Sequence, residues 1–265
     1  MNKTVAITGA SSGIGWALAL EYAKSGANLI AIGRNAERLQ ALKTEMEKLR
    51  TSPAQTFLTE TCDVRELGQL EALAQKLSSI DVLIHSAGVS YPQFLEQIPA
   101  REVDSLLSKN LIAPIHLTRV MLPHFKKRKA GHIAFVGSIA GEVNILGYTI
   151  YGASKAGLFA FADSLRNEMV PYNVKVSIIH PPDTKTPMLE GEKKIRPEIV
   201  QKLSEGGGLL TPESVAKSLM KGMAKGRFKI FPDFTSCLLS SLFRKFPRLM
   251  RCYLDGKVRS LSQAK

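Results

Sequence analysis

Thr8-Gly9-Ala10-Ser11-Ser12-Gly13-Ile14-Gly15 is the stretch that decides the fold of this chain. It follows the apolar run Val5-Ala6-Ile7 and leads into a helix-length segment. Glycines allow a tight turn in which backbone N–H groups approach a pyrophosphate, and the next helix adds partial positive charge. The spacing G-x3-G-x-G differs from the common G-x-G-x-x-G fingerprint, and an ordinary strand-to-helix turn is the alternative. Its position favours dinucleotide binding. The residues expected to make contact are Gly9, Ser11, Ser12, Gly13, Ile14 and Gly15.

Apolar runs rich in β-branched residues alternate with helix-length amphipathic stretches beyond this turn. The runs occupy residues 5–7, 29–32, 82–84, 133–136 and 174–179, with weaker candidates at 57–58 and 228–231. Strands separated by such helices predict a parallel sheet covered on both faces. We therefore expect an α/β fold, a Rossmann-like doubly wound parallel sheet in three α/β/α layers, with ligands beyond the carboxyl ends of the strands. Residues 1–232 would form this single domain.

The bulk composition limits the class of protein. A chain of 265 residues with 45% apolar residues can bury the core of one α/β domain. Its three cysteines, Cys62, Cys237 and Cys252, have neither metal-ligand spacing nor an even number, so we expect no metal site and no disulfide framework. The first residues lack the apolar stretch of a signal peptide, which predicts a cytoplasmic location.

The remaining segment, residues 233–265, is a basic amphipathic tail. Residues 221–265 hold eleven Lys or Arg against Asp233 and Asp255, a net +9 out of a total of +13, so the rest of the chain is only mildly basic and nucleic acid is not expected. Its longest uncharged run, 234–243, is too short to span a bilayer. Apolar residues interleaved with cations favour a helix lying on an anionic membrane, split at Pro247. A helix docked on its own domain or on another subunit is the alternative.

Arg34 follows the second predicted strand, within Gly33-Arg34-Asn35. A cofactor without a 2′-phosphate is usually held here by an acidic residue, whereas a nearby arginine accommodates the 2′-phosphate. Arg34 therefore argues for NADPH. A solvated arginine at a helix start is the alternative.

Tyr151-Gly152-Ala153-Ser154-Lys155 places a phenol and an ammonium on one helix face. For Tyr151 to act as an acid and a base near neutral pH, its pKa would have to fall by up to about 3. Such a change corresponds to about 4 kcal/mol. We expect Lys155 and the oxidised nicotinamide to favour the phenolate, and Tyr151 to donate the proton to a carbonyl oxygen during reduction. Ser138 lies thirteen residues earlier, at the end of a predicted strand.

A second set in the tail has the same spacing. Ser240, Tyr253 and Lys257 repeat the intervals between Ser138, Tyr151 and Lys155, so spacing alone cannot identify a site. The tail set follows no buried strand, and Gly256 should weaken a helix joining Tyr253 to Lys257. We therefore expect the chemistry at the first set.

With these residues in place, the chain resembles the short-chain dehydrogenase/reductase family over roughly residues 3–232. The matching motifs are the glycine turn, Asp63-Val64, Ala87-Gly88, Asn110, Ser138 and Tyr151/Lys155. The resemblance implies that Asp63 and Val64 flank the adenine and that Ala87 and Gly88 border the cofactor. It also implies that Lys155 binds the nicotinamide ribose, that Ser138 orients the carbonyl, and that Asn110 supports a water relaying protons to Lys155.

Two positions depart from the family pattern. His85-Ser86 stands where the family has two asparagines, and we expect His85 to replace the asparagine structurally rather than to act as a base. Pro181-Pro182 replaces Pro-Gly, and the loop from Pro181 to Pro187 resembles that of the 3-ketodihydrosphingosine reductases. The resemblance places Pro181, Thr184 and Thr186 at the cofactor and residues 183–210 in a substrate lid. Gly206-Gly207-Gly208 would be its hinge or merely a surface loop.

This resemblance implies NADPH-dependent reduction of the 3-keto group of 3-ketodihydrosphingosine, a hydrophobic long-chain 2-amino-3-ketone, in sphingolipid synthesis. Two other functions stay open: reduction of another ketone (3-oxoacyl, steroid or small carbonyl), and a nonenzymatic protein that binds acidic lipid or nucleic acid. Relatives commonly pair through the helices at 110–127 and 149–170, so a homodimer or homotetramer is expected. Phe159 and Phe161 could serve that contact or the core.

Overall fold

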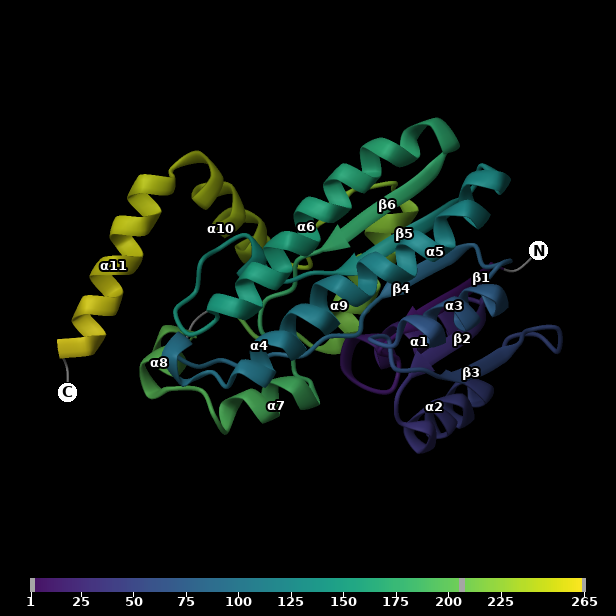
Figure 1. Ribbon diagram of the computed structural model, residues 1–265, viewed down its shortest axis with the longest axis horizontal. Helices are drawn as coiled ribbons and strands as arrows, with labels where there is room; N and C mark the ends of the chain where they lie inside the picture. The colour runs from purple at the N-terminus through teal and green to yellow at the C-terminus, as the bar shows by residue number, and fades with distance from the viewer. Residues whose placement is uncertain (1–2, 205–207, 264–265) are drawn as a thin grey trace.

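A seven-stranded parallel sheet is the centre of the computed structural model, which describes residues 3–204 and 208–263 (Figure 1). The strand order is β3-β2-β1-β4-β5-β6-β7. The strands are β1 (Thr4–Thr8), β2 (Asn28–Gly33), β3 (Phe57–Thr61), β4 (Val82–His85), β5 (Gly131–Val136), β6 (Val174–Ile179) and β7 (Lys229–Ile230). The order reverses between β1 and β4, which creates the crevice where doubly wound sheets bind ligands.

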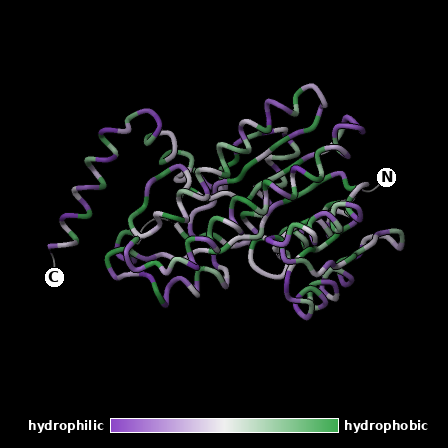
Figure 2. The backbone as a smooth tube through the Cα atoms, in the orientation of Figure 1, coloured by the Kyte–Doolittle hydropathy of each residue, from purple (hydrophilic) through white to green (hydrophobic). Residues whose placement is uncertain are grey.

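Helices cover both faces of this sheet and complete the three predicted layers. One apolar core joins the sheet to α1 (Gly13–Lys24), α2 (Ala36–Lys48) and α9 (Pro212–Ala224). The other joins it to α3 (Leu67–Lys76), α5 (Ala113–Arg128) and α6 (Thr149–Met169). Figure 2 shows the apolar strands running through the centre of the molecule. The expected α/β fold is therefore confirmed.

Local signals in the sequence set the ends of these elements. The Asn35 side chain caps α2 by accepting a hydrogen bond from the backbone N–H of Arg38 at 2.8 Å. Thr211 caps α9 in the same way, with Pro212 in the first turn. In the parallel register, Thr8 pairs with Ile32 on one side and with His85 on the other. The residues that follow β1, β2 and β4 therefore meet at one edge of the sheet.

Four further helices of the described residues lie outside the two helical layers. They are α4 (Ala100–Leu107), which continues through a π turn (Ser108–Ile112) into α5, then α7 (Pro187–Lys193) and α8 (Glu198–Ser204) in the predicted lid, and α10 (Phe234–Lys245) in the tail. Single 3-10 turns occupy Leu95–Gln97, Ile139–Gly141 and Val170–Tyr172.

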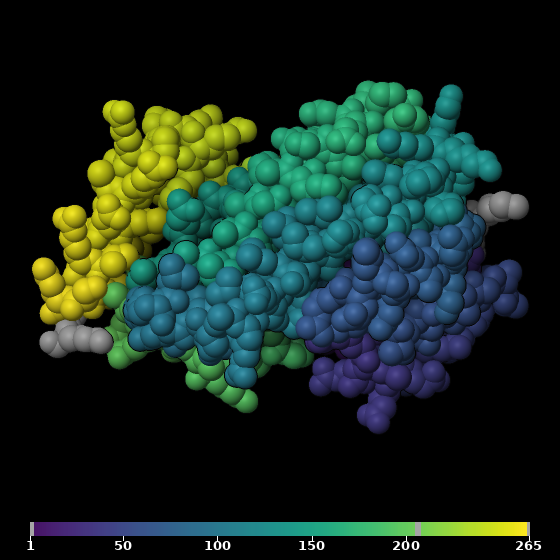
Figure 3. All heavy atoms as spheres, viewed as in Figure 1, coloured from purple at the N-terminus to yellow at the C-terminus, as the bar shows by residue number. Residues whose placement is uncertain are grey.

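The tail is split at Pro247 into α10 and α11 (Pro247–Gln263), as predicted. It docks on its own domain, which is one of the alternatives left open by the sequence, because α10 buries Ser236 and Ser240 against the domain while α11 contacts α8. Figure 3 shows the tail as a separate lobe at one end of the molecule. Gly256, which is expected to weaken the helix, does not end it, since α11 runs through this position. None of the described helices is both long and apolar enough to cross a bilayer.

A polar cluster fastens α10 to the sheet edge. The Lys229 ammonium in β7 lies 2.6 Å from a Glu142 carboxylate oxygen, and the Ser240 hydroxyl of α10 donates to the same oxygen at 2.8 Å. The buried His180 ring lies 3.4 Å from the other Glu142 oxygen and 3.2 Å from the Ser138 carbonyl oxygen. Burial raises the pKa of Glu142, but its cationic and hydrogen-bonding neighbours lower it on balance.

Phe159 and Phe161 pack toward the domain interior. Both are partly buried against the second core, and the Phe161 ring meets Phe135 edge to face at 5.8 Å. This packing favours the core role for these two residues over a contact between subunits.

Candidate active site

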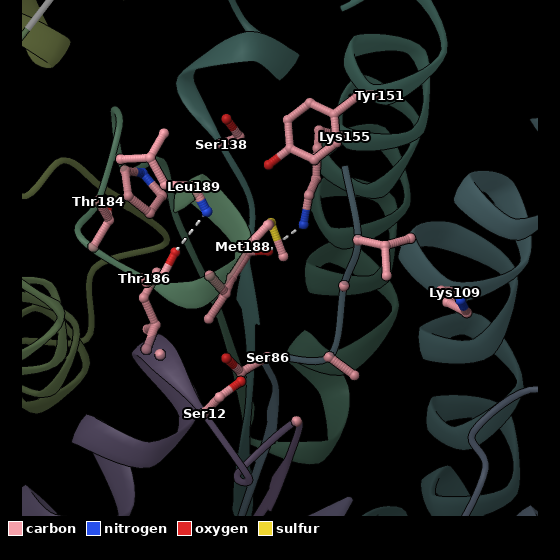
Figure 4. A pocket seen from close by; sticks show the side chains of 18 of the residues that line it. Ser12, Ser86, Lys109, Ser138, Tyr151, Lys155, Thr184, Thr186, Met188 and Leu189 are labelled. Atoms are coloured by element: carbon pink, nitrogen blue, oxygen red, sulfur yellow. Dashed lines mark hydrogen bonds between the residues drawn. The ribbon is translucent and has the colours of Figure 1, made fainter. Parts of the chain in front are cut away.

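A cavity of about 270 Å³ opens at the carboxyl ends of the strands. It collects lining residues from the turn after β1, from the ends of β2, β4 and β5, from α6 and from the lid (Figure 4). Most residues predicted to form the site line it. They are Gly9, Ser11, Ser12, Gly13, Ile14, Arg34, Asp63, Val64, Ala87, Gly88, Ser138, Tyr151, Lys155, Pro181, Thr184 and Thr186. Gly15 and Asn110 lie outside this lining.

The glycine turn lets its backbone approach its neighbours closely. Gly9 has φ +69°, and a side-chain Cβ there would lie 2.6 Å from the Ala87 backbone. Gly13 has φ +57° and begins α1, whose first N–H groups are not capped by the Ser12 side chain. This combination of a bare turn and an open helix N-terminus suits a pyrophosphate. Gly15 is needed for the turn itself, because a Cβ there would collide with the Gly9 carbonyl.

The cavity has two cations that come from separate parts of the chain. Exposed Arg34 and half-buried Lys109 both line the cavity. Burial lowers the pKa of Lys109, and the charges of Arg34 and Arg65 lower it further, which places the three cations near one another. Lys109 did not stand out in the sequence, because it lies about 75 residues beyond Arg34 in an ordinary helical stretch.

Asp63 is held by a neighbouring arginine. Arg65 donates from Nε to the Asp63 carboxylate at 3.0 Å, and this hydrogen bond lowers the pKa of Asp63 to about 2. The carboxylate is therefore charged and fixed in place beside Val64 at the cavity wall. This position is consistent with the predicted adenine contact, which stays a prediction.

Ser138, Tyr151 and Lys155 point into the same part of the cavity (Figure 4). Ser138 follows β5 and caps the 3-10 turn after it, accepting from the Ala140 N–H at 3.1 Å. Tyr151 and Lys155 stand one turn apart on α6, and Lys155 Nζ lies 5.7 Å from the centre of the Tyr151 ring. The buried Lys155 ammonium donates to the Val136 carbonyl at 2.9 Å, which locks its orientation.

The groups of the protein itself do not lower the pKa of Tyr151; together they raise it. Burial raises this pKa, and the charges of Glu192 and Asp183 raise it further, while a side-chain hydrogen bond with Ser138 lowers it. Burial also lowers the pKa of Lys155 to about 8. The protein therefore holds Tyr151 in its protonated form, which is the form a proton donor needs.

Asn110 clamps the loop that follows β4. It sits in the π turn between α4 and α5, a local irregularity that is frequent at functional sites. Its amide accepts from the Val89 N–H and donates to the Val89 carbonyl, both at 2.9 Å, and it also donates to Ser154 at 3.1 Å. A Cβ at Gly88 would lie 3.2 Å from Asn110 Oδ1 and 3.6 Å from Lys155 Nζ. Asn110 thus positions the loop beside Lys155, and its water relay stays a prediction.

The predicted lid closes on itself at its base. Thr184 bridges to Leu210, and the Leu210 N–H donates to the Asp183 carbonyl at 3.0 Å. Thr186 caps α7 by accepting from Leu189, and the Thr184 hydroxyl donates to the Pro182 carbonyl at 2.9 Å. Of the proposed glycine hinge, Gly206 and Gly207 lie outside the described residues.

A buried ionic network joins the lid to the site and was not foreseen. Tyr148 donates to Glu192 Oε2 at 2.7 Å, and Arg196 donates to the same oxygen at 2.8 Å and to Asp183 at 3.2 Å. Tyr148, Asp183 and Glu192 all line the cavity. Tyr148 and Glu192 are 44 positions apart, so only the folded chain brings them together.

His85 has the structural role expected for it. Its ring is buried, stacks on Phe135 at 4.9 Å and lies 3.0 Å from the Thr118 hydroxyl. Burial lowers its pKa to about 3, so the ring is neutral near pH 7. A base would need access to the cavity, which His85 does not line.

The tail set does not form a second site. Ser240 is buried in the cluster with Glu142, whereas the Tyr253 side chain is 53% exposed on α11. Lys257 lies over the Tyr253 ring on α11, and Figure 1 shows this helix at the far end of the molecule from the sheet. This contrast supports the expectation that the chemistry lies at the first set, which stays a prediction.

Comparison with known proteins agrees with this geometry. The family model described as short chain dehydrogenase matches residues 3–196. The chain belongs to the short-chain dehydrogenase family. Mouse 3-ketodihydrosphingosine reductase is 34% identical to this short-chain dehydrogenase over 243 residues, which cover 90% of this chain and 73% of the mouse protein. The 3-dehydrosphinganine reductase of Danio rerio is 35% identical over 229 residues, covering 84% and 69%.

A solved structure shares the fold of this short-chain dehydrogenase. A short-chain dehydrogenase from Sphingobium yanoikuyae, in complex with NADPH, superposes with a TM-score of 0.80 at 24% identity. The match covers 94% of this chain and 95% of that one.

Proposed function

We propose that this short-chain dehydrogenase uses NADPH to reduce the 3-keto group of 3-ketodihydrosphingosine, giving dihydrosphingosine. One observation carries the proposal: Ser138, Tyr151 and Lys155 share one cavity. The chain is also 34–35% identical, over most of its length, to reductases named for this substrate.

The donor set of the cavity fits a phosphorylated dinucleotide. The glycine turn and the start of α1 offer N–H groups to the pyrophosphate, and Arg34 with Lys109 offers positive charge to a 2′-phosphate. Lys155, Thr184 and Thr186 would hold the nicotinamide half. NADPH supplies the hydride when it is bound.

Tyr151 provides the proton for the reduced carbonyl oxygen. Because its pKa is raised, Tyr151 keeps its proton until negative charge develops on that oxygen. Ser138 donates a second hydrogen bond to the same oxygen and stabilises the developing charge. Lys155, held by Val136, brings positive charge next to the phenol as it loses its proton.

The tail would bring the enzyme to its lipid substrate. It exposes five large apolar side chains to solvent, and the neighbouring cations are exposed as well. The apolar residues are Phe234, Leu238, Phe246, Leu249 and Tyr253, and the cations include Arg244, Lys245, Arg248 and Arg251. Such a surface suits peripheral binding to an anionic membrane, on its cytoplasmic face.

Self-association through α5 and α6 is also part of this proposal. Ile112, directly before α5, is 44% exposed and Val170, directly after α6, is 66% exposed, so apolar side chains are open next to the ends of both helices. We expect a homodimer or homotetramer, which light scattering after gel filtration measures directly.

The test is NADPH oxidation by the purified protein. We expect turnover with 3-ketodihydrosphingosine and much slower turnover with a 3-oxoacyl thioester of equal chain length. Faster turnover of the thioester would replace the proposed substrate with an oxoacyl one. No ketone-dependent oxidation at all would refute a reductase.

A further inference from the structure

The network of Tyr148, Asp183, Glu192 and Arg196 places a carboxylate inside the reaction cavity. The Glu192 side chain is only 9% exposed and comes from α7 in the lid. It lies on the same cavity as Tyr151, and the Tyr148 and Tyr151 rings meet edge to face at 5.8 Å. Glu192 is therefore a near neighbour of the reacting position.

One of the two oxygens of the Glu192 carboxylate accepts no hydrogen bond from the described residues. Within residues 3–204 and 208–263, every hydrogen bond to Glu192 falls on Oε2, from Tyr148 at 2.7 Å and from Arg196 at 2.8 Å. Oε1 therefore has no donor from the described protein. Oε1 is not among the fully buried side-chain atoms that lack a partner, so it is open to the cavity that Glu192 lines, where a donor on a ligand can reach it.

The charges of the network do not balance. Asp183 and Glu192 carry two negative charges, and Arg196, whose side chain is 4% exposed, carries one positive charge. The surplus negative charge reaches the reaction centre, since both carboxylates raise the pKa of Tyr151. The nearest buried ammonium, Lys155, is already directed at the Val136 carbonyl. The lid side of the cavity thus favours one further cation.

We propose that Glu192, with Asp183 behind it, forms a subsite for an ammonium group next to the carbonyl that is reduced. This inference rests on the proposed function, in which the substrate has an amino group on the carbon adjacent to the ketone. Tyr148 and Arg196 orient the carboxylate, and Oε1 accepts from the ammonium. Glu192 then selects 2-amino ketones from other long-chain ketones.

The test compares two ketones in the full-length enzyme. One is 3-ketodihydrosphingosine, and the other is the same chain without the amino group, 1-hydroxyoctadecan-3-one. We expect Glu192→Gln to lower kcat/KM for the amino ketone by about 10- to 100-fold, mainly through KM, because a charge-assisted hydrogen bond is lost. The loss for the deaminated ketone should be much smaller. Asp183→Asn should also lower the ratio of kcat/KM for the amino ketone to kcat/KM for the deaminated ketone, by a smaller factor than Glu192→Gln.

Glu190→Gln is the matched control. Glu190 lies on the same helix, is exposed and pairs with Lys193 at 2.8 Å, so its neutralisation should leave the ratio of the two ketones unchanged. Equal losses on both ketones in Glu192→Gln would show a role in lid structure alone and overturn the subsite. A wild-type enzyme that reduces both ketones equally well would also overturn it. Reduction of neither ketone would instead refute the proposed function, and the subsite with it.

Discussion

At the scale of single residues, Tyr151 carries the proton transfer. Tyr151→Phe removes the donor but preserves the ring that packs against Tyr148. We expect ketone reduction to fall by about 10²- to 10⁴-fold, the usual contribution of a general acid. NADPH affinity, measured by fluorescence titration, should change little. Turnover close to that of the wild type would contradict the assignment.

Arg34 and Lys109 should decide between the two nicotinamide cofactors. Arg34→Ala removes an exposed cation at the cavity wall. We expect the affinity for NADPH to fall about 10- to 100-fold and the affinity for NADH to change little. Lys109→Met should act in the same direction. Dissociation constants for both cofactors provide the measurement, and equal weakening of NADH and NADPH would exclude contact with a 2′-phosphate.

Two buried histidines, His85 and His180, and the partly buried His132 should make stability depend on pH. Burial lowers the pKa of His85 to about 3, and those of His132 and His180 to about 4. As the pH falls from about 6.5 toward 4, the unfolded chain binds protons that the folded chain does not. The free energy of unfolding should therefore decrease by up to about 1.4 kcal/mol per pH unit for each histidine.

Urea unfolding at pH 7, 6 and 5 measures this slope. His85→Asn restores the side chain typical of the family. It should reduce the slope of unfolding free energy against pH by the contribution of one histidine, while the enzyme stays folded at pH 7. A slope identical to that of the wild type would show that His85 does not titrate in this range.

At the scale of elements, Glu142 links β7 to α10, because it forms an ion pair with Lys229 and accepts a hydrogen bond from Ser240. Lys229→Met leaves the Glu142 carboxylate, which is 9% exposed, without its cation. Removing one partner of such a pair costs about 3 kcal/mol of stability. Urea unfolding measures the loss, and Lys225→Met, at an exposed position after α9, is the control that should change stability by less than about 0.5 kcal/mol.

The elements themselves were largely predictable, because their signals are local. The strands, the cap at Asn35 and the break at Pro247 each depend on residues that are neighbours in the chain. The helix through Gly256 was not, since contact between α11 and α8 outweighs the weak propensity of a single glycine.

The site was predictable only where a motif marks it. Ser138, Tyr151 and Lys155 follow from strand placement, whereas the partnership of Tyr148 with Glu192 arises from tertiary packing. For the same reason, the sequence did not show that burial, and then the lid carboxylates Glu192 and Asp183, raise the pKa of Tyr151 in the protein alone.

At the scale of the whole molecule, the tail should bind membranes. Ending the chain after Phe246 removes α11 but keeps α10 on the domain. We expect this variant to lose co-sedimentation with vesicles containing phosphatidylserine, while turnover of a dispersed ketone persists. Vesicles of phosphatidylcholine alone are the control, since they lack the anionic attraction. Binding to anionic vesicles as strong as that of the full chain would exclude α11 as the anchor.

The contact between α11 and α8 has a consequence for how such an enzyme meets its substrate. In the proposed membrane-bound state, α11 would carry α8 and the lid toward the lipid surface. The ketone would then travel sideways within a two-dimensional film rather than through water. Its abundance per unit of film area, and not its concentration in the surrounding volume, sets how often the cavity is filled.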